Sequence, residues 1–163
     1  EGTFVLPGTH AKWIRVANGA IADFRTYMTG DLFSAVHNHT ILSRSKTESV
    51  DPAAFDDGLD MAKGLSAPGD LLTRLFTIRA EGLMGRAADT ATLGLISGLL
   101  IGAEVLSATR EAGDVVIVGA SALAQDYTRA FDRFEVRHRP LREELAPRGQ
   151  ALIAKRRIGA AQH

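Results

Sequence analysis

FVLPGTHAKW, residues 4–13, is the stretch that decides the fold, because an apolar run breaks there at Pro-Gly and resumes at Trp13. Asn18-Gly19 next predicts a tight hairpin, since both central positions of a type I′ turn need a positive φ. Three successive strands are therefore expected, the third over residues 20–27. The turn Gly8-Thr9-His10 combines bare backbone N–H groups with a hydroxyl and a cation, a pattern typical of phosphate sites. An ordinary polar hairpin corner is the alternative.

The rest of the chain changes period twice. Helical spacing of apolar residues dominates from about residue 31 to residue 111. The β-branched run of residues 114–118 then predicts a strand buried on both faces. A turn at Gly119-Ala120-Ser121 leads into an amphipathic helix over residues 122–134, followed by a short edge strand over residues 135–140 and a last helix over residues 147–157. The expected fold class is α/β, with three antiparallel strands, then helices, then a strand-helix-strand-helix unit.

One apolar run, residues 93–105 (LGLISGLLIGAEV), calls for a membrane check. A bilayer span needs about 20 apolar residues, so this run is too short, and Glu104 stands near its end. Small residues recur along it at Gly94, Gly98 and Gly102, a stripe that lets helices approach closely. A buried helix is expected, and self-association through the stripe, giving a homodimer, is the alternative use.

Composition excludes several classes of protein. The 163 residues suit one domain, with 45% hydrophobic residues for a core. Nineteen basic and nineteen acidic residues cancel, so no global charge draws the chain to nucleic acid or anionic lipid. The absence of cysteine excludes thiolate metal sites and fits a reducing cytoplasm. His37 and His39 lie two apart on a helix end, a poor spacing for shared metal binding.

Five segments, in order, resemble the 2-dehydro-3-deoxygalactonokinase family, a branch of the sugar kinase, chaperone ATPase and actin superfamily: LPGTHAKW (6–13), DFRTYMTGDLF (23–33), LLTRLFTIRAEGL (71–83), ISGLLIGAE (96–104) and VVIVGASALAQDYTRAF (115–131). The resemblance implies a ribonuclease-H-like lobe of the actin-like ATPase fold over residues 1–163. It covers only the second half of such a kinase. The Asp-x-Gly-Thr/Ser turn of the first lobe is missing, since Leu6 stands where the aspartate would be. The chain is therefore expected to be a C-terminal lobe that needs an N-terminal lobe as its partner.

The resemblance also implies two contacts with ATP and its Mg²⁺. The β- and γ-phosphates are expected at Gly8-Thr9-His10, where His10 or Lys12 neutralises developing charge. The nucleoside is expected at Gly119-Ala120-Ser121, where a strand ends at a helix N-terminus. The same VVIVGAS string could open a dinucleotide-binding unit, but its G-x-G-x-x-G spacing is unmet, because Ser121 and Ala124 stand in place of glycines.

Residues for the sugar are less well marked. Asp31 and His10 are candidates for the general base, and the missing lobe is the expected source of it. Arg25 on the third strand is a candidate partner for a substrate carboxylate. The function implied is ATP-dependent phosphorylation of 2-dehydro-3-deoxy-D-galactonate at its 6-hydroxyl. A non-catalytic binding or dimerisation module derived from a kinase lobe is the alternative.

Overall fold

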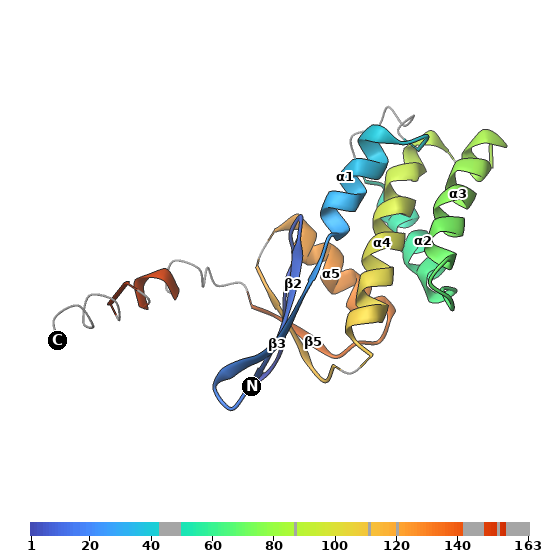
Figure 1. Ribbon diagram of the computed structural model, residues 1–163. Helices are drawn as coiled ribbons and strands as arrows, with labels where there is room; N and C mark the ends of the chain where they lie inside the picture. Colours follow the sequence, from blue (N-terminus) through green and yellow to red (C-terminus); the bar gives the residue numbers. More distant parts are fainter. Residues whose placement is uncertain are drawn as a thin grey trace.

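The computed structural model describes residues 1–42, 50–86, 88–110, 112–119, 121–141, 149–152 and 154–155. In these residues a five-stranded sheet lies beside a group of helices (Figure 1). The elements in chain order are β1 (Gly2–Leu6), β2 (Ala11–Ala17), β3 (Ala20–Tyr27), α1 (Thr29–His39), α2 (Pro52–Lys63), α3 (Asp70–Leu83), the 3₁₀ helix η1 (Asp89–Ala91), α4 (Thr92–Ala108), β4 (Val115–Val118), α5 (Ala122–Arg133) and β5 (His138–Leu141).

The sheet has the strand order β3-β2-β1-β4-β5. β1 pairs with β2 in antiparallel register, and β2 pairs likewise with β3. β4 lies parallel to β1, with Val5 opposite Ile117, and β5 lies parallel to β4. Because β1 and β4 run in the same direction as neighbours, both end at the same edge of the sheet. The turn after Leu6 and the turn after Val118 are therefore adjacent.

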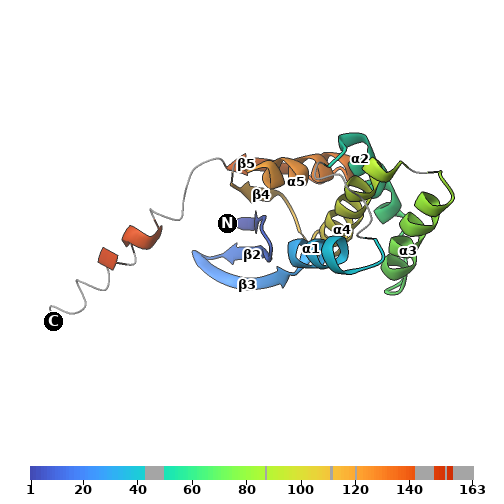
Figure 2. The same ribbon diagram turned by 90° about the horizontal axis from the view of Figure 1, so that it is seen from above.

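The main core lies between the sheet and its helices. Val5, Trp13 and Ile117 are buried on one face of the sheet, as the alternation of strand side chains requires. They pack against apolar residues of α2, α4 and α5, and the rings of Trp13 and Phe131 meet edge to face with centroids 5.8 Å apart. The helices α1, α2 and α3 surround the sheet-distal part of α4, and α3 lies farthest from the sheet in both views (Figure 2).

The glycine stripe of α4 is covered within the chain. A Cβ on Gly98 would stand 2.0 Å from the carbonyl oxygen of Phe55, and one on Gly94 would stand 2.6 Å from that of Asp51. Gly102 is equally close to the Cβ of Ala62, at 2.5 Å. The prediction of a buried helix is confirmed. The alternative use of the stripe in self-association is wrong, because α2 occupies it; a homodimer through another surface stays a prediction.

Two ion pairs fasten α2 to α5 at the surface. The guanidinium of Arg129 donates two hydrogen bonds of 2.6 Å to the two carboxylate oxygens of Asp56. One turn further on, Arg133 forms a second two-point contact with Asp60. Aspartates four residues apart on α2 therefore face arginines four residues apart on α5.

The remaining predictions divide into three groups. The three N-terminal strands, the strand at 115–118 and the helix that follows it are confirmed. The edge strand was placed too early: Glu135 has a φ of +57°, which closes the end of α5, so β5 begins only at His138. Of the last predicted helix, residues 149–152 and 154–155 are described and are helical, and its other positions lie outside the described residues. None of the helices in the described part of the chain combines the length and apolar character that a bilayer crossing requires.

Candidate functional site

The turn between β1 and β2 is supported from behind by the start of α1. The amide of Asp31 donates to the carbonyl oxygen of Thr9 at 3.1 Å. A Cβ on Gly30 would stand 2.8 Å from the Cα of Thr9, so only glycine permits this approach. In front the turn is open, because a Cβ on Gly8 would meet no atom within 4 Å. The turn is thus held on one side and accessible on the other.

The side chains of this turn differ in what they contact. The hydroxyl of Thr9 is exposed and makes no hydrogen bond within the described residues. His10 Nε2 lies 3.6 Å from Asp31 Oδ2, with both side chains half exposed. The structure therefore brings together the two residues that were separate candidates for the base. Lys12 Nζ donates to the carbonyl oxygen of His10 at 2.7 Å, so in this structure the ammonium braces the turn itself.

An apolar pocket of about 180 Å³ opens beside Gly8. Its walls come from the turn, α1, α4 and α5, and it is lined by Gly8, Thr29, Gly30, Phe33, Val50, Ser97, Leu100, Ile101, Leu123, Asp126 and Tyr127. Asp126 supplies its carboxylate. Burial raises the pKa of this carboxyl, against a smaller opposing effect of the charge on Arg129. No hydrogen bond or ion pair to another described residue engages the Asp126 carboxylate, so it is free to accept one from a ligand.

Directly behind this pocket lies a buried carboxylate, Glu104, whose residue is 3% exposed. Its Oε1 accepts hydrogen bonds from Trp13 Nε1 at 2.7 Å and from the Tyr127 hydroxyl at 2.8 Å. Its Oε2 accepts a hydrogen bond from the Thr29 hydroxyl. Burial raises the pKa of Glu104, although the three donors oppose that shift. Burial also raises the pKa of Tyr127, and the Glu104 charge adds to the shift.

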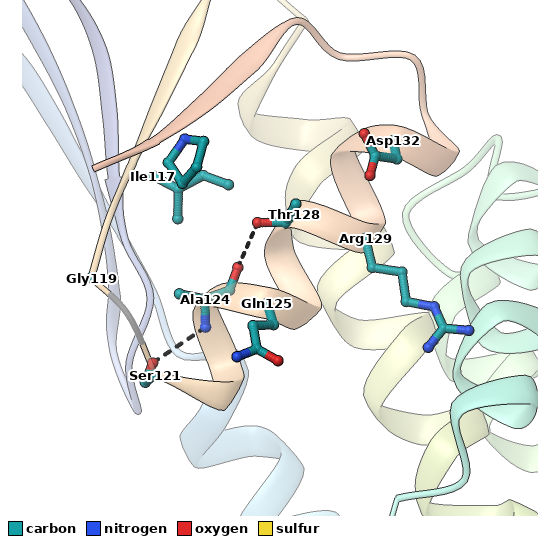
Figure 3. Close-up of a pocket in the computed structure, with 9 residues that line it drawn as sticks. Ile117, Gly119, Ser121, Ala124, Gln125, Thr128, Arg129 and Asp132 are labelled. Carbon is teal, nitrogen blue, oxygen red and sulfur yellow. Dashed lines mark hydrogen bonds between the residues drawn. The ribbon is translucent and has the colours of Figure 1, made fainter. Parts of the chain in front are cut away.

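The turn after β4 borders a second hollow, of about 290 Å³, on the other side of α5 (Figure 3). Gly119 has a φ of +128°, which only glycine adopts readily, and its amide donates to Leu141 at 3.0 Å. Ser121 caps α5, because its hydroxyl accepts a hydrogen bond from the amide of Ala124 at 3.3 Å. Ala120 lies outside the described residues. Arg129, which also lines this hollow, extends towards α2, where Asp56 binds it.

The predicted strand-turn-helix geometry at Gly119-Ser121 is thus present, but the two predicted halves of the nucleotide site line different hollows. Gly8 lines the apolar pocket, whereas Gly119 and Ser121 line the hollow across α5. Since β1 and β4 are neighbours, the two turns still share one edge of the sheet.

Arg25 lies in neither of these places. Its guanidinium donates to the carbonyl oxygen of Ala108, the last residue of α4, at 3.4 Å. There it faces the negative end of the helix dipole. It lines a separate hollow together with Thr3, Trp13, Arg15 and Asp23. The structure therefore gives Arg25 a structural partner and does not bring it to the Gly8 turn.

Sequence reasoning missed Glu104, Thr29 and Asp126 as members of the site. Glu104 did carry a signal, since it is a lone acid in an otherwise apolar helix. Thr29 and Asp126 carried none, because their place depends on which faces of α1 and α5 meet. Within the part of the chain that the structure describes, no three His, Asp or Glu side chains gather as a metal site would require.

Comparison with known proteins identifies the family. Residues 1–153 match the family model of 2-keto-3-deoxy-galactonokinase. A protein of Rhizobium meliloti (strain 1021) named as a 2-dehydro-3-deoxygalactonokinase is 32% identical over 160 residues, covering 94% of this chain and 52% of the relative. The 2-dehydro-3-deoxygalactonokinase of Escherichia coli (strain K12) is 36% identical over 132 residues, covering 78% and 44%.

A solved structure agrees with these matches. The crystal structure of a protein from Sinorhizobium meliloti described as a 2-dehydro-3-deoxygalactonokinase superposes with a TM-score of 0.85 at 31% identity, covering 96% of this chain and 52% of that one. The chain thus spans about half the length of the curated relatives it matches. With its family model matched from the first strand to the C-terminal helical segment, the chain belongs to the 2-keto-3-deoxy-galactonokinase family.

Proposed function

We propose that this chain is the C-terminal, nucleotide-binding lobe of a kinase that phosphorylates 2-dehydro-3-deoxy-D-galactonate at its 6-hydroxyl. Family membership supports the reaction class and the substrate. The strand order β3-β2-β1-β4-β5, with an antiparallel half and a parallel half, supports a ribonuclease-H-like lobe. One observation carries the nucleotide assignment: the open Gly8 turn and the apolar pocket beside α5 form a continuous surface at the edge where β1 and β4 end.

The residues of this surface fit ATP. A glycine with open space in front of it lets a phosphate approach the backbone, and the exposed hydroxyl of Thr9 is ready to donate. We place the phosphates at Gly8-Thr9-His10 and the nucleotide base in the apolar pocket that Gly8 borders. In this pocket Asp126 can accept a hydrogen bond from an amino or hydroxyl group. The hollow at Gly119 and Ser121, across α5, is the alternative place for the nucleoside. ATP, with Mg²⁺ on its phosphates, would supply the phosphoryl group.

The side chains of the turn would then act on developing charge. Thr9 and the turn amides donate to phosphate oxygens, which matters most where negative charge builds up during transfer. His10 is oriented by Asp31 and can present a proton or a positive charge towards the same oxygens. We assign the general base to the other lobe, because Asp31 is already engaged by His10 and by its place at the start of α1.

The test combines this chain with a first lobe. The chain alone and the chain supplied with the first half of a family member, fused or co-expressed, would be assayed for ADP release dependent on the sugar acid. We expect no transfer by the chain alone and clear transfer by the pair. Robust phosphorylation by the 163-residue chain alone would contradict the half-enzyme assignment. Failure of the folded pair to bind ATP would contradict the nucleotide assignment.

A non-catalytic dimerisation module has lost its main support. That alternative depended on the glycine stripe of α4, which α2 covers inside the chain.

A further inference from the structure

Glu104 joins three separate elements at one point inside the protein. Its three donors are Trp13 on β2, Thr29 at the start of α1 and Tyr127 on α5. The distances in sequence are 91, 75 and 23 residues, so no local structure explains the cluster. A buried carboxylate is costly unless its hydrogen bonds are satisfied, whereas a leucine would fill the same space in this apolar helix at no such cost. Unlike a leucine, the carboxylate can orient the side chains that donate to it, because hydrogen bonds are directional.

Two of these donors are also walls of the apolar pocket. Thr29 and Tyr127 both line the pocket, while Glu104 itself lies behind them. The hydroxyl groups of Thr29 and Tyr127 both donate to Glu104. These hydrogen bonds fix the rotamers of two side chains that line the proposed site of the nucleotide base. The carboxylate therefore sets the shape of the pocket without lining it.

The same cluster reaches the Gly8-Thr9-His10 turn from both of its flanks. On one flank, Thr29 is followed directly by Gly30 and Asp31, which hold Thr9 from behind. On the other flank, β2 leaves the turn at Ala11 and places Trp13 against Glu104 two residues later. A shift at Glu104 would be passed to the turn through both connections.

We propose that Glu104 is a positioning residue, which fixes the Gly8-Thr9-His10 turn and the α1 wall of the apolar pocket through Thr29 and Trp13. The effect of Glu104 on the position of the turn concerns this chain alone. Its consequence for nucleotide binding rests on the proposed function. The two parts can therefore be tested separately.

Two substitutions at Glu104 separate the effect of its hydrogen bonds from the effect of its side-chain volume. In Glu104→Gln the amide oxygen can still accept hydrogen bonds from Trp13 and Tyr127. The amide nitrogen takes the place of Oε2 and can donate to the Thr29 oxygen, so this hydrogen bond is kept with its direction reversed. Glu104→Leu keeps a comparable volume and removes every polar contact. Ile78→Ala is the matched control for lost stability, since Ile78 is buried on α3 and does not line the pocket.

Hydrogen exchange tests the position of the turn without any nucleotide. The reporter is the amide of Asp31, which is bonded to the Thr9 carbonyl oxygen. The amide of Ile117 reports global opening, because β4 is an interior strand paired with both β1 and β5. In Glu104→Leu we expect the Asp31 amide to lose protection by about tenfold more than Ile117 does, a local cost of about 1.4 kcal/mol. In Glu104→Gln and Ile78→Ala the two amides should change together. An Asp31 amide in Glu104→Leu that follows Ile117, as in Ile78→Ala, would overturn the proposal.

Single-donor variants keep the test decisive if Glu104→Leu fails to fold. Thr29→Val removes one hydroxyl at nearly constant shape, and Thr29→Ser keeps it. Only the valine variant should accelerate exchange at Asp31, and equal exchange in the two variants would overturn the proposal.

Kinetics in the two-lobed enzyme tests the consequence. Glu104→Leu should raise the KM for ATP about tenfold or more, while Glu104→Gln and Ile78→Ala stay close to the unsubstituted enzyme. Thr29→Val in the Glu104→Leu background should change the KM for ATP little further, because its effect acts through the same contact.

A normal KM for ATP in a folded Glu104→Leu enzyme would contradict the positioning role even if the nucleotide assignment holds. An enzyme that binds no ATP before substitution would contradict the proposed function, while the exchange experiment still decides the role of Glu104.

Discussion

Gly58 and Gly98 meet backbone to backbone where α2 crosses α4: a Cβ on either residue would stand 3.0 Å from the Cα of the other. Neither helix could approach so closely with a larger residue. A Cβ on Gly58 would also stand 2.5 Å from the carbonyl oxygen of Leu95. Glycine costs each helix about 1 kcal/mol in propensity, and the close packing of α2 on the buried α4 offsets it.

Gly98→Ala should therefore destabilise the fold although alanine is the better helix former. The new methyl would stand 2.0 Å from a backbone oxygen of Phe55, which cannot move without shifting α2. We expect a loss of about 1–3 kcal/mol or more in the free energy of unfolding, measured by urea denaturation. Gly82→Ala is the matched control, because Gly82 is helical and an added Cβ there meets nothing within 4 Å. That variant should be stabilised by about 0.5–1 kcal/mol. Equal effects at the two positions would contradict the packing argument.

Much of the fold could be predicted because its signals are local. Asn18-Gly19 specifies a hairpin by its backbone needs, and the structure has Asn18 at a φ of 53° and Gly19 at 72°. The run at 115–118 is apolar on both faces, which marked it as an interior strand. The start of β5 was missed because the φ of +57° at Glu135 is a local rearrangement that its residue type does not announce.

Thr9→Val tests the phosphate turn. If the Thr9 hydroxyl donates to the phosphoryl group during transfer, its loss should lower kcat in the two-lobed enzyme by about 10²–10³-fold, with a smaller effect on the KM for the sugar acid. The turn itself should keep its shape, because the hydroxyl makes no hydrogen bond within the described residues. Thr26→Val, the same change at an exposed position of β3, serves as the control. A kcat within a few-fold of the unsubstituted enzyme would return the turn to a structural role.

Ser97→Leu tests the placement of the nucleotide base in the apolar pocket. Ser97 lines the apolar pocket from α4, and a leucine there would fill part of its 180 Å³. We expect the KM for ATP to rise about tenfold or more, equivalent to about 1.4 kcal/mol, while the KM for the sugar acid hardly changes. Ser107→Leu, on an exposed position of the same helix, controls for the substitution itself. Thermal melting of both variants would establish that they fold.

A companion variant distinguishes the two hollows beside α5. Gln125→Trp places a larger side chain in the hollow lined by Gly119 and Ser121, which Gln125 also lines (Figure 3). If this variant raised the KM for ATP and Ser97→Leu did not, the base would lie on the Gly119 side of α5.

The candidate site could be predicted from the sequence only where its residues are consecutive positions of one motif. The turn at Gly8-Thr9-His10 carries its chemistry in consecutive positions, so the sequence could indicate it. Thr29, Glu104 and Asp126 come from three helices, and they converge because Glu104 faces the sheet while α1 and α5 close over it. Arg25 shows the converse limit: its residue type suits a substrate carboxylate, but the strand register directs it to the end of α4.

The pH dependence of stability provides a test of the buried carboxyl. Burial raises the pKa of Glu104 above its ordinary value of 4.5. Between that value and the folded-state pKa, the folded protein holds a proton on Glu104 that the unfolded chain has released. Folding therefore binds protons in this interval, so the contribution of Glu104 to stability is fully present below the ordinary pKa and is lost as the pH rises through the folded one. The other titratable group in contact with it, Tyr127 from α5, has a pKa raised above the usual tyrosine range and stays protonated throughout.

Glu104→Gln removes this titration and keeps the hydrogen bonds. The difference in the free energy of unfolding between the unsubstituted chain and the variant, measured in urea from about pH 4.5 upward, should therefore shift in favour of the variant as the pH rises. The slope should approach about 1.4 kcal/mol per pH unit at most. Comparing the two proteins at each pH cancels the effects of Asp126, which also has a raised pKa, and of Asp60 and Asp70, whose pKa values are lowered. A difference that stays constant with pH for Glu104→Gln would mean that the Glu104 carboxyl titrates alike in the folded and unfolded chain, because the effect of its three donors balances the effect of its burial.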